Sequence, residues 1–125
     1  MIYLDTHVVV WLYAGMIEKL SSDAKYLINE HDLYISPIVR LELDYLFEIG
    51  KITCHADLIL TDLSERIGLT VCAKEFNTIM GQALQCTWTR DPFDRLIVGQ
   101  AAVVNRNKLL TKDRRILANY SKAVW

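Results

Sequence analysis

The sequence predicts an α/β fold, a three-layer α/β/α sandwich with a central parallel sheet of about five strands. The first observation behind this prediction is that short, mostly apolar runs alternate with helical patterns along the whole chain. The second is that these runs lack a polar side, which is typical of parallel strands covered by helices on both faces. The third is that no repeat, linker or biased segment interrupts the 125 residues, so we expect residues 1–125 to form a single domain.

The predicted strands are the short apolar runs, and the predicted helices fill the intervals between them. Strands are expected at Ile2–Leu4, Leu33–Ser36, Leu69–Cys72, Lys108–Thr111 and Ala123–Trp125. Helices are expected at His7–Ala14, Ser22–Glu30, Ile38–Ile49, Ala56–Ile67, Lys74–Leu84, Phe93–Asn107 and Arg114–Asn119. Alternation of this kind is typical of βαβ units, in which ligands bind beyond the carboxyl ends of the strands.

Composition excludes several classes of protein. Apolar residues make up 52% and charged residues 23% of the chain, which is unlike a disordered or fibrous sequence. The longest apolar run, Val8 to Ile17, is shorter than the roughly 20 residues that span a bilayer, and the N-terminus lacks the basic start of a signal peptide. The three cysteines lack the spacing of a metal site, so we interpret them as reduced thiols of a cytoplasmic protein.

Charge is distributed unevenly along a chain whose net charge is −1. Residues 1–89 carry 6 Lys or Arg against 12 Asp or Glu, whereas residues 90–125 carry 8 against 3. A basic final third is suited to a polyanion. On charge alone, chance clustering on a mixed, solvated surface is the simpler explanation.

Two aspartates directly follow predicted strands. Asp5 comes after Ile2–Leu4, and Asp113 comes two residues after the Leu109-Leu110-Thr111 run. Both are therefore expected at the carboxyl edge of the sheet, and both are also good helix N-caps, because Asp accepts bonds from free backbone N–H groups. The cap and the functional site are both open interpretations for each residue.

Two further acids are predicted to face inward. On a helical wheel, Glu42 lies in the same arc as the apolar residues of its helix, and Asp94 lies among Ile97, Val98 and Ala101 of its own helix. A buried carboxylate is costly unless a cation or strong donors meet it. An arginine partner or a helix cap is the alternative for Glu42, and a capping box is the alternative for Asp94. Asp91 precedes a proline and is interpreted as an N-cap.

These four acids are predicted to converge on divalent cations. Carboxylates packed together repel one another unless a positive charge lies between them, and Mg²⁺ prefers oxygen ligands. A two-metal site of this type hydrolyses phosphodiesters. Basic residues flank Asp94 and Asp113 in the sequence and are expected to contact substrate phosphates; they are Arg90, Arg95, Lys112, Arg114 and Arg115.

Four segments carry a resemblance to a known family. They are Tyr3-Leu4-Asp5-Thr6-His7, then Ile35-Ser36-Pro37-Ile38 through Leu41-Glu42-Leu43 to Gly50-Lys51-Ile52, then Arg90-Asp91-Pro92-Phe93-Asp94-Arg95-Leu96-Ile97, and Leu110-Thr111-Lys112-Asp113-Arg114-Arg115. In this order they resemble a PIN-domain ribonuclease, and most of all the VapC-type toxins of prokaryotic toxin–antitoxin pairs. The closing Ala123-Val124-Trp125 is also similar, so the resemblance covers the whole chain. One such segment alone is a weak signal, whereas four in order are a strong one.

The resemblance implies roles for individual residues. Asp5, Glu42, Asp94 and Asp113 match the acidic quartet of the family, the last of these at its more variable position. Thr6 and Thr111 match positions where the family often has a small hydroxyl residue near the metal. Asp91 belongs to a pattern found in one branch of the family and is not counted as a ligand. The resemblance further implies endoribonuclease activity that depends on one or two Mg²⁺ or Mn²⁺ ions, an inhibiting antitoxin, and frequent homodimerisation.

Two other functions compete with an endoribonuclease toxin. A PIN fold without catalysis could serve as a nucleic-acid or protein-binding module, although a pure binder gains nothing from carboxylates that face phosphates. A hydrolase of small phosphorylated molecules is disfavoured, because the chain lacks a glycine-rich phosphate loop and an activating Ser or Cys motif. We expect two of four aromatic residues to contact an antitoxin or a second subunit, with core packing as the alternative for each; they are Trp11, Tyr13, Tyr45 and Phe47. His7 is interpreted as a helix-start residue only.

Overall fold

The sheet of the computed structural model, which describes residues 1–103 and 105–125, has five parallel strands in the order β3-β2-β1-β4-β5. The strands are β1 (Ile2–Leu4), β2 (Leu33–Ile35), β3 (Thr70–Val71), β4 (Lys108–Leu110) and β5 (Ala123–Val124). The first strand is central, with Tyr3 beside Tyr34 on one side and Leu109 on the other. The α/β prediction with a five-stranded parallel sheet is therefore confirmed.

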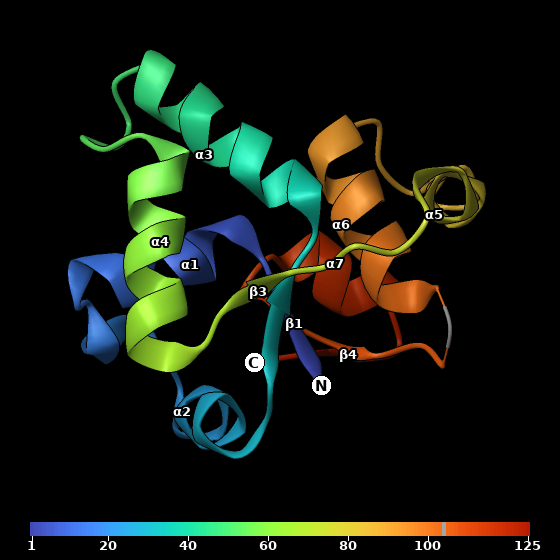
Figure 1. Cartoon of the computed structure of the whole chain (residues 1–125). Coiled ribbons are helices and arrows are strands. Elements are labelled where there is room, and N and C mark those ends of the chain that lie inside the picture. The colour runs from blue at the N-terminus through green and yellow to red at the C-terminus, as the bar shows by residue number, and fades with distance from the viewer. Residues whose placement is uncertain (104) are drawn as a thin grey trace.

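Within the described residues, seven α-helices and one short 3₁₀ helix, η1 (Ile17–Lys19), connect the strands. The α-helices are α1 (Thr6–Ala14), α2 (Ser22–Glu30), α3 (Pro37–Glu48), α4 (Ala56–Ile67), α5 (Phe76–Ala83), α6 (Pro92–Ala102) and α7 (Arg114–Asn119). In Figure 1, α1, α2 and α4 lie to the left of the strands and α5 and α6 to the right, while α3 extends above the carboxyl end of the sheet. The sheet is thus enclosed between helices, as the apolar strands predict.

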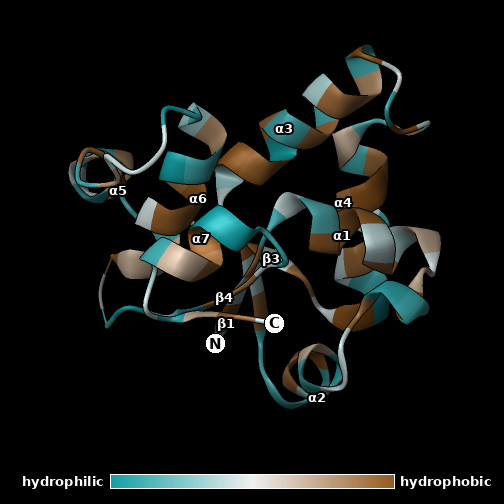
Figure 2. Ribbon diagram, turned by 180° about the vertical axis from the view of Figure 1, so that it is seen from behind, coloured by the Kyte–Doolittle hydropathy of each residue, from teal (hydrophilic) through white to brown (hydrophobic). Residues whose placement is uncertain are grey.

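The core is built on the strands. Ile2, Leu4, Leu109 and Leu110 are fully buried, and Tyr3 is almost so. Figure 2 shows this pattern as brown colour on the strands and mixed colour on the outer helices. Among the described residues, no helix is both long enough and apolar enough to cross a bilayer.

Two predicted helices are shorter than expected. The helix predicted at Phe93–Asn107 ends at Ala102, because Val103 is extended and the backbones of Asn105 and Arg106 are left-handed, with φ of 66° and 45°. Val104, which also falls in that prediction, lies outside the described residues. The helix predicted at Lys74–Leu84 begins only at Phe76, since the Glu75 carboxylate caps it and accepts from the N–H groups of Asn77 and Thr78.

Helix α6 is held tightly against α5. A Cβ added to Gly99 of α6 would lie 3.0 Å from the backbone nitrogen of Ala83 and from the carbonyl oxygen of Ile79, so a side chain there would push the two helices apart by a few tenths of an ångström. Arg95 of α6 bonds the same part of α5: it donates from Nε to the carbonyl of Ala83 and from a terminal nitrogen to that of Leu84, both at 3.1 Å. This packing fixes the first turn of α6, which carries Asp94, beside the sheet.

Candidate active site

The centre of the site is Asp5, the residue that follows β1. Its backbone N–H donates to the carbonyl of Leu110 in β4 at 3.0 Å, so it continues the sheet pairing, and the residue is only 4% exposed. One carboxylate oxygen accepts from the backbone N–H of Thr6 at 2.8 Å, and the other accepts from the Thr111 hydroxyl at 2.7 Å. Asp5 is the N-cap of α1 as well. The two interpretations of this residue are therefore compatible.

Glu42 reaches the same place from α3. Ser36 caps this helix and Pro37 begins it, which directs the second turn over the carboxyl end of β1. The Thr6 hydroxyl donates to Glu42 Oε1, so the partner of the inward-facing carboxylate is a neutral hydroxyl. Burial raises the pKa of Glu42; the Thr6 bond opposes this shift, and the charges of Asp5 and Asp91 add to it.

Asp94 approaches from the first turn of α6. Asp91 is the N-cap of that helix, as predicted, and accepts from the N–H groups of Phe93 at 2.8 Å and Asp94 at 3.3 Å. The side chain of Asp94 is half-buried, and burial is the largest cause that raises its pKa to about 7. The negative charges of Asp91, Asp5, Asp113 and Glu42 raise it further, in that order. The pKa of Asp94 therefore depends on the charges of all three of the other predicted acids.

Asp113 is joined to Asp5 through one hydroxyl. Thr111 Oγ1 donates to Asp5 and accepts from the backbone N–H of Asp113 at 3.0 Å. The Asp113 carboxylate caps α7, because its Oδ1 accepts from the N–H groups of Arg115 at 2.8 Å and Ile116 at 3.0 Å. The structure thus brings all four predicted acids to one edge of the sheet. We call Asp5, Glu42, Asp94 and Asp113 the acid cluster.

Among the described residues, the acid cluster has no lysine or arginine partner. Within the described part of the chain, no Lys or Arg forms an ion pair with any of its members; the nearest such contact is His7 Nδ1, 3.7 Å from Asp5 Oδ2. Nor do three acidic, histidine or cysteine side chains of residues 1–103 and 105–125 stand close enough to hold a metal ion as they are placed. The donors are nevertheless all carboxylate or hydroxyl oxygens, which suit Mg²⁺ or Mn²⁺. Their mutual repulsion is also what a cation would relieve.

The hydroxyl and basic residues that are predicted around the acid cluster occupy different surroundings. Thr6 and Thr111 are buried and donate to the acid cluster, so their hydroxyls orient carboxylates. Arg90 donates to the carbonyl of Thr87 at 2.9 Å, and Arg95 is engaged with α5 as described. Three basic side chains are exposed beside Asp113, namely Lys112, Arg114 and Arg115.

One residue of the site has more contacts than a helix start requires. His7 Nε2 accepts from the backbone N–H of Lys112 at 2.9 Å, and its ring lies 4.9 Å from that of Trp11. His7 thereby fastens the turn after β4 to the start of α1. In the sequence, His7 stands out only because it directly follows Asp5-Thr6, and this position does not indicate Lys112 as its partner.

The four aromatic residues expected at interfaces all have neighbours within the chain. Trp11 lies 5.8 Å from Trp125, and Phe47 lies 3.9 Å from His55, ring centre to ring centre. Tyr13 Oη is 3.6 Å from Cys54 Sγ. Tyr45 lies 5.8 Å from Phe93 and remains 46% exposed. Contact with a partner stays a prediction for these residues.

The fold and the acid cluster together define a class, the parallel α/β proteins with carboxylates at the carboxyl edge of the sheet. Residues 2–122 match the PIN domain, and the chain belongs to the PIN domain family. The structure is similar to that of VapBC2 from Rickettsia felis, bound to a DNA fragment from its promoter, with a TM-score of 0.66, 19% identity, and coverage of 99% of this chain and 96% of the other. It is similar also to a toxin–antitoxin complex from Klebsiella pneumoniae, with a TM-score of 0.68, 17% identity, and coverage of 100% and 97%. No curated protein matches the sequence.

Proposed function

We propose that this protein is a metal-dependent endoribonuclease that hydrolyses RNA phosphodiester bonds. The observation that supports this most is the half-buried carboxylate of Asp94, which no cation among the described residues neutralises and whose pKa is raised to about 7 by burial and by other acids. Such an arrangement is unfavourable for stability alone. It becomes favourable when a divalent cation and a phosphate occupy the cluster, and strongly shifted carboxyl groups are typical of functional sites.

The acid cluster is the proposed metal site. Asp5, Glu42 and Asp94 would hold one or two Mg²⁺ or Mn²⁺ ions, with Asp113 assisting directly or through water. When bound, such a cation supplies positive charge at the phosphodiester and lowers the pKa of a water molecule. Thr6 and Thr111 position this site. The Thr6 hydroxyl donates to the Glu42 carboxylate on α3, and the Thr111 hydroxyl donates to the Asp5 carboxylate at the end of β1.

The remaining residues would bind and orient RNA. Lys112, Arg114 and Arg115 are exposed next to Asp113, where ammonium and guanidinium groups can contact the phosphates of an incoming strand. Arg90, which is exposed in the loop before α6, would be a further phosphate contact through the nitrogens that do not bond the Thr87 carbonyl. Arg95 would act at a distance, by holding α6 and hence Asp94 in place.

Cleavage of RNA by variants of the acid cluster tests this function. Asp5→Asn and Asp94→Asn should each abolish cleavage of total RNA in Mg²⁺ or Mn²⁺ while the protein stays folded by circular dichroism. Asp57→Asn is the matched control, because Asp57 is an exposed carboxylate paired with Arg40 on another face. Variants of Asp5 and Asp94 that cut RNA as fast as the wild type would refute the assignment. A folded wild type that binds RNA and cuts none would favour the binding module.

Partner binding is a further part of the proposal. One structural neighbour is described as a toxin–antitoxin complex and another as VapBC2 bound to promoter DNA, which supports a toxin held by a cognate antitoxin. We expect this toxin to be cytoplasmic and to form a homodimer. Leu41 and Tyr45 of α3 and Ile49, the residue after it, lie at four-residue intervals, each about half exposed, and we expect the second subunit to cover this stripe. Tyr45→Ala should shift the protein toward the monomer in analytical ultracentrifugation. An unchanged sedimentation profile would remove this surface from consideration.

A further inference from the structure

Beside the acid cluster, next to the proposed phosphate contact Lys112, lie two tryptophans that the proposed reaction does not use. The rings of Trp11 in α1 and Trp125 after β5 lie 5.8 Å apart, edge to face. Lys112 Nζ lies 6.0 Å from the centre of each ring, and Lys19 Nζ lies 5.8 Å from that of Trp11. Both indoles are half-buried. We call Trp11, Trp125 and Lys112 the indole cluster.

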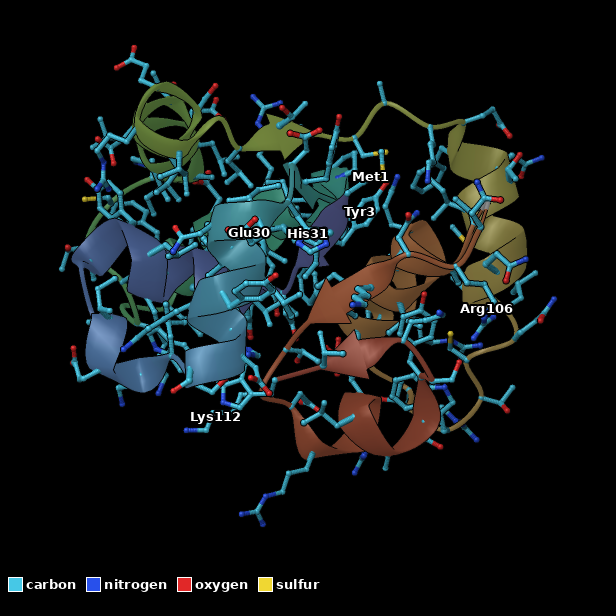
Figure 3. The ribbon with its side chains drawn as sticks, turned by 90° about the horizontal axis from the view of Figure 1, so that it is seen from below. Met1, Tyr3, Glu30, His31, Arg106 and Lys112 are labelled. Carbon is cyan, nitrogen blue, oxygen red and sulfur yellow. The ribbon has the colours of Figure 1, made fainter. Side chains whose placement is uncertain are left out.

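The indole cluster is continuous with the acid cluster. Lys112 is the residue after Thr111, whose hydroxyl donates to Asp5, and its own N–H donates to His7. Thr111 also donates from its backbone N–H to the carbonyl of Val124, the residue before Trp125, at 3.0 Å. The two clusters therefore share the carboxyl edge of the sheet around β4. Figure 3 shows Lys112 at the periphery of the molecule, between the blue N-terminal helices and the red α7.

The chemistry of the indole cluster suits a nucleotide. A half-buried indole is held rigidly by the core, so a flat ligand stacks on it with little loss of side-chain freedom, and every nucleobase has a π face. Both rings pack against the core, and the ammonium groups of Lys112 and Lys19 lie within 6.0 Å of their centres. A lysine that a base displaces from the ring is placed beside the phosphate of the same nucleotide, which replaces one favourable contact by another.

We propose that Trp11 and Trp125 form a stacking subsite for a nucleobase of single-stranded RNA next to the bond that is cut, with Lys112 as its phosphate contact. The proposal rests on the proposed function for the identity of the ligand. Such a subsite predicts that the protein binds single-stranded RNA more tightly than duplex RNA, because the bases of a duplex are already stacked and cannot reach an indole. His7 has a positioning role, since it fastens the Lys112 backbone to α1.

The test measures binding of a short fluorescein-labelled RNA of mixed sequence by anisotropy, in Mg²⁺ and in the Asp94→Asn background, which prevents cleavage. Trp125→Leu should weaken binding about ten-fold with an unchanged salt dependence, and Trp125→Phe should recover most of the loss. Lys112→Met should instead lower the slope of log affinity on log salt by about 0.7, the value of one single-strand phosphate contact. Phe76→Leu, which removes an exposed aromatic ring from α5, is the matched control and should bind as the parent does.

Two results would overturn the stacking subsite. One is a Trp125→Leu protein that melts like its parent and binds the RNA equally well. The other is equal affinity of the parent for the single strand and for the blunt duplex of the same sequence, which needs no variant and therefore holds even where Trp125→Leu fails to fold. Failure of the proposed function looks different: wild-type protein would then leave the RNA intact in Mg²⁺ and Mn²⁺ while the tryptophan variants still lose affinity.

Discussion

Carboxylates on two regions of this molecule are treated in opposite ways. On the outer face of α3 and α4, Arg40 grips both oxygens of Asp57 at 2.6 and 2.8 Å, and Arg66 lies 2.6 Å from Asp62. The hydrogen bond from Arg40 lowers the pKa of Asp57. At the carboxyl edge of the sheet, neutral hydroxyls and backbone N–H groups meet the acids, and the pKa of Asp94 rises to about 7.

The difference lies in what neutralises each carboxylate. A paired carboxylate on the surface is already neutralised and has nothing left to bind. The carboxylates of the acid cluster have no lysine or arginine partner among the described residues, and several of them close together leave the folded protein with repulsion that a cation removes. Single substitutions in each region test this difference.

The largest effect on stability is expected at Thr111. Its fully buried hydroxyl donates to Asp5 and accepts from Asp113, so Thr111→Val takes a partner from a buried carboxylate oxygen and from a part-buried N–H. Such a loss typically costs about 1–3 kcal/mol. Chemical denaturation should show it. Thr70→Val is the control, because the Thr70 hydroxyl is exposed and bonds only the nearby Gly68 carbonyl, and a cost as large as that of Thr111→Val there would contradict this reading.

A smaller effect of opposite sign is expected at Asp94. In the presence of a chelator, Asp94→Asn removes one of several repelling charges and should raise the melting temperature by a few degrees. The result separates the two regions clearly, since removal of a paired carboxylate has no such benefit. A metal-free Asp94→Asn protein that melts below the wild type would show that Asp94 has a stabilising partner.

The pH dependence of metal-free stability follows from the same residue. Because the folded-state pKa of Asp94, about 7, lies above the ordinary value of 3.8, the folded protein takes up a proton that the unfolded chain releases. The penalty of ionising Asp94 is fully present above about 7 and is lost progressively as the pH falls from about 7 toward 3.8. Wild-type protein in chelator should therefore gain stability on mild acidification. Thermal melts at several pH values should show a smaller gain for Asp94→Asn, and equal gains would contradict the shift.

The smallest effect is expected on the outer face of α3 and α4. Asp57→Asn breaks a fully exposed pair with Arg40 and should change the melting temperature little, slightly downward if at all. High salt should erase even that difference, because exposed charges are screened. A large loss, comparable with that at Thr111, would mean that the two regions do not differ as described.

Sequence reasoning reached the positions of the acid cluster because simple rules govern them. Asp5 and Asp113 follow parallel strands, whose carboxyl ends share one edge of the sheet, and the helical wheel turns Glu42 and Asp94 inward. The five strands and most helix limits followed from apolar runs and cap residues. Predicted roles in catalysis remain predictions for these residues.

The contacts that organise the site lay beyond such rules. Thr111 and Asp5 are 106 positions apart, and Lys112 and His7 are 105 apart, so no local pattern connects them. The overlong helix predicted at Phe93–Asn107 failed for another reason. Its residues continue a helical pattern, but the left-handed backbones of Asn105 and Arg106 are set by the turn into β4.

Melting of the purified protein with and without saturating Mn²⁺ tests the central claim most directly, for wild type, Asp94→Asn and Asp57→Asn. A cation bound only by the folded state at 100 times its dissociation constant adds about 2.7 kcal/mol, which is a shift of several degrees for a chain of this size. We predict that wild type and Asp57→Asn show this shift and that Asp94→Asn loses it. No shift in the wild type, or an equal shift in all three proteins, would contradict a metal site built from the acid cluster.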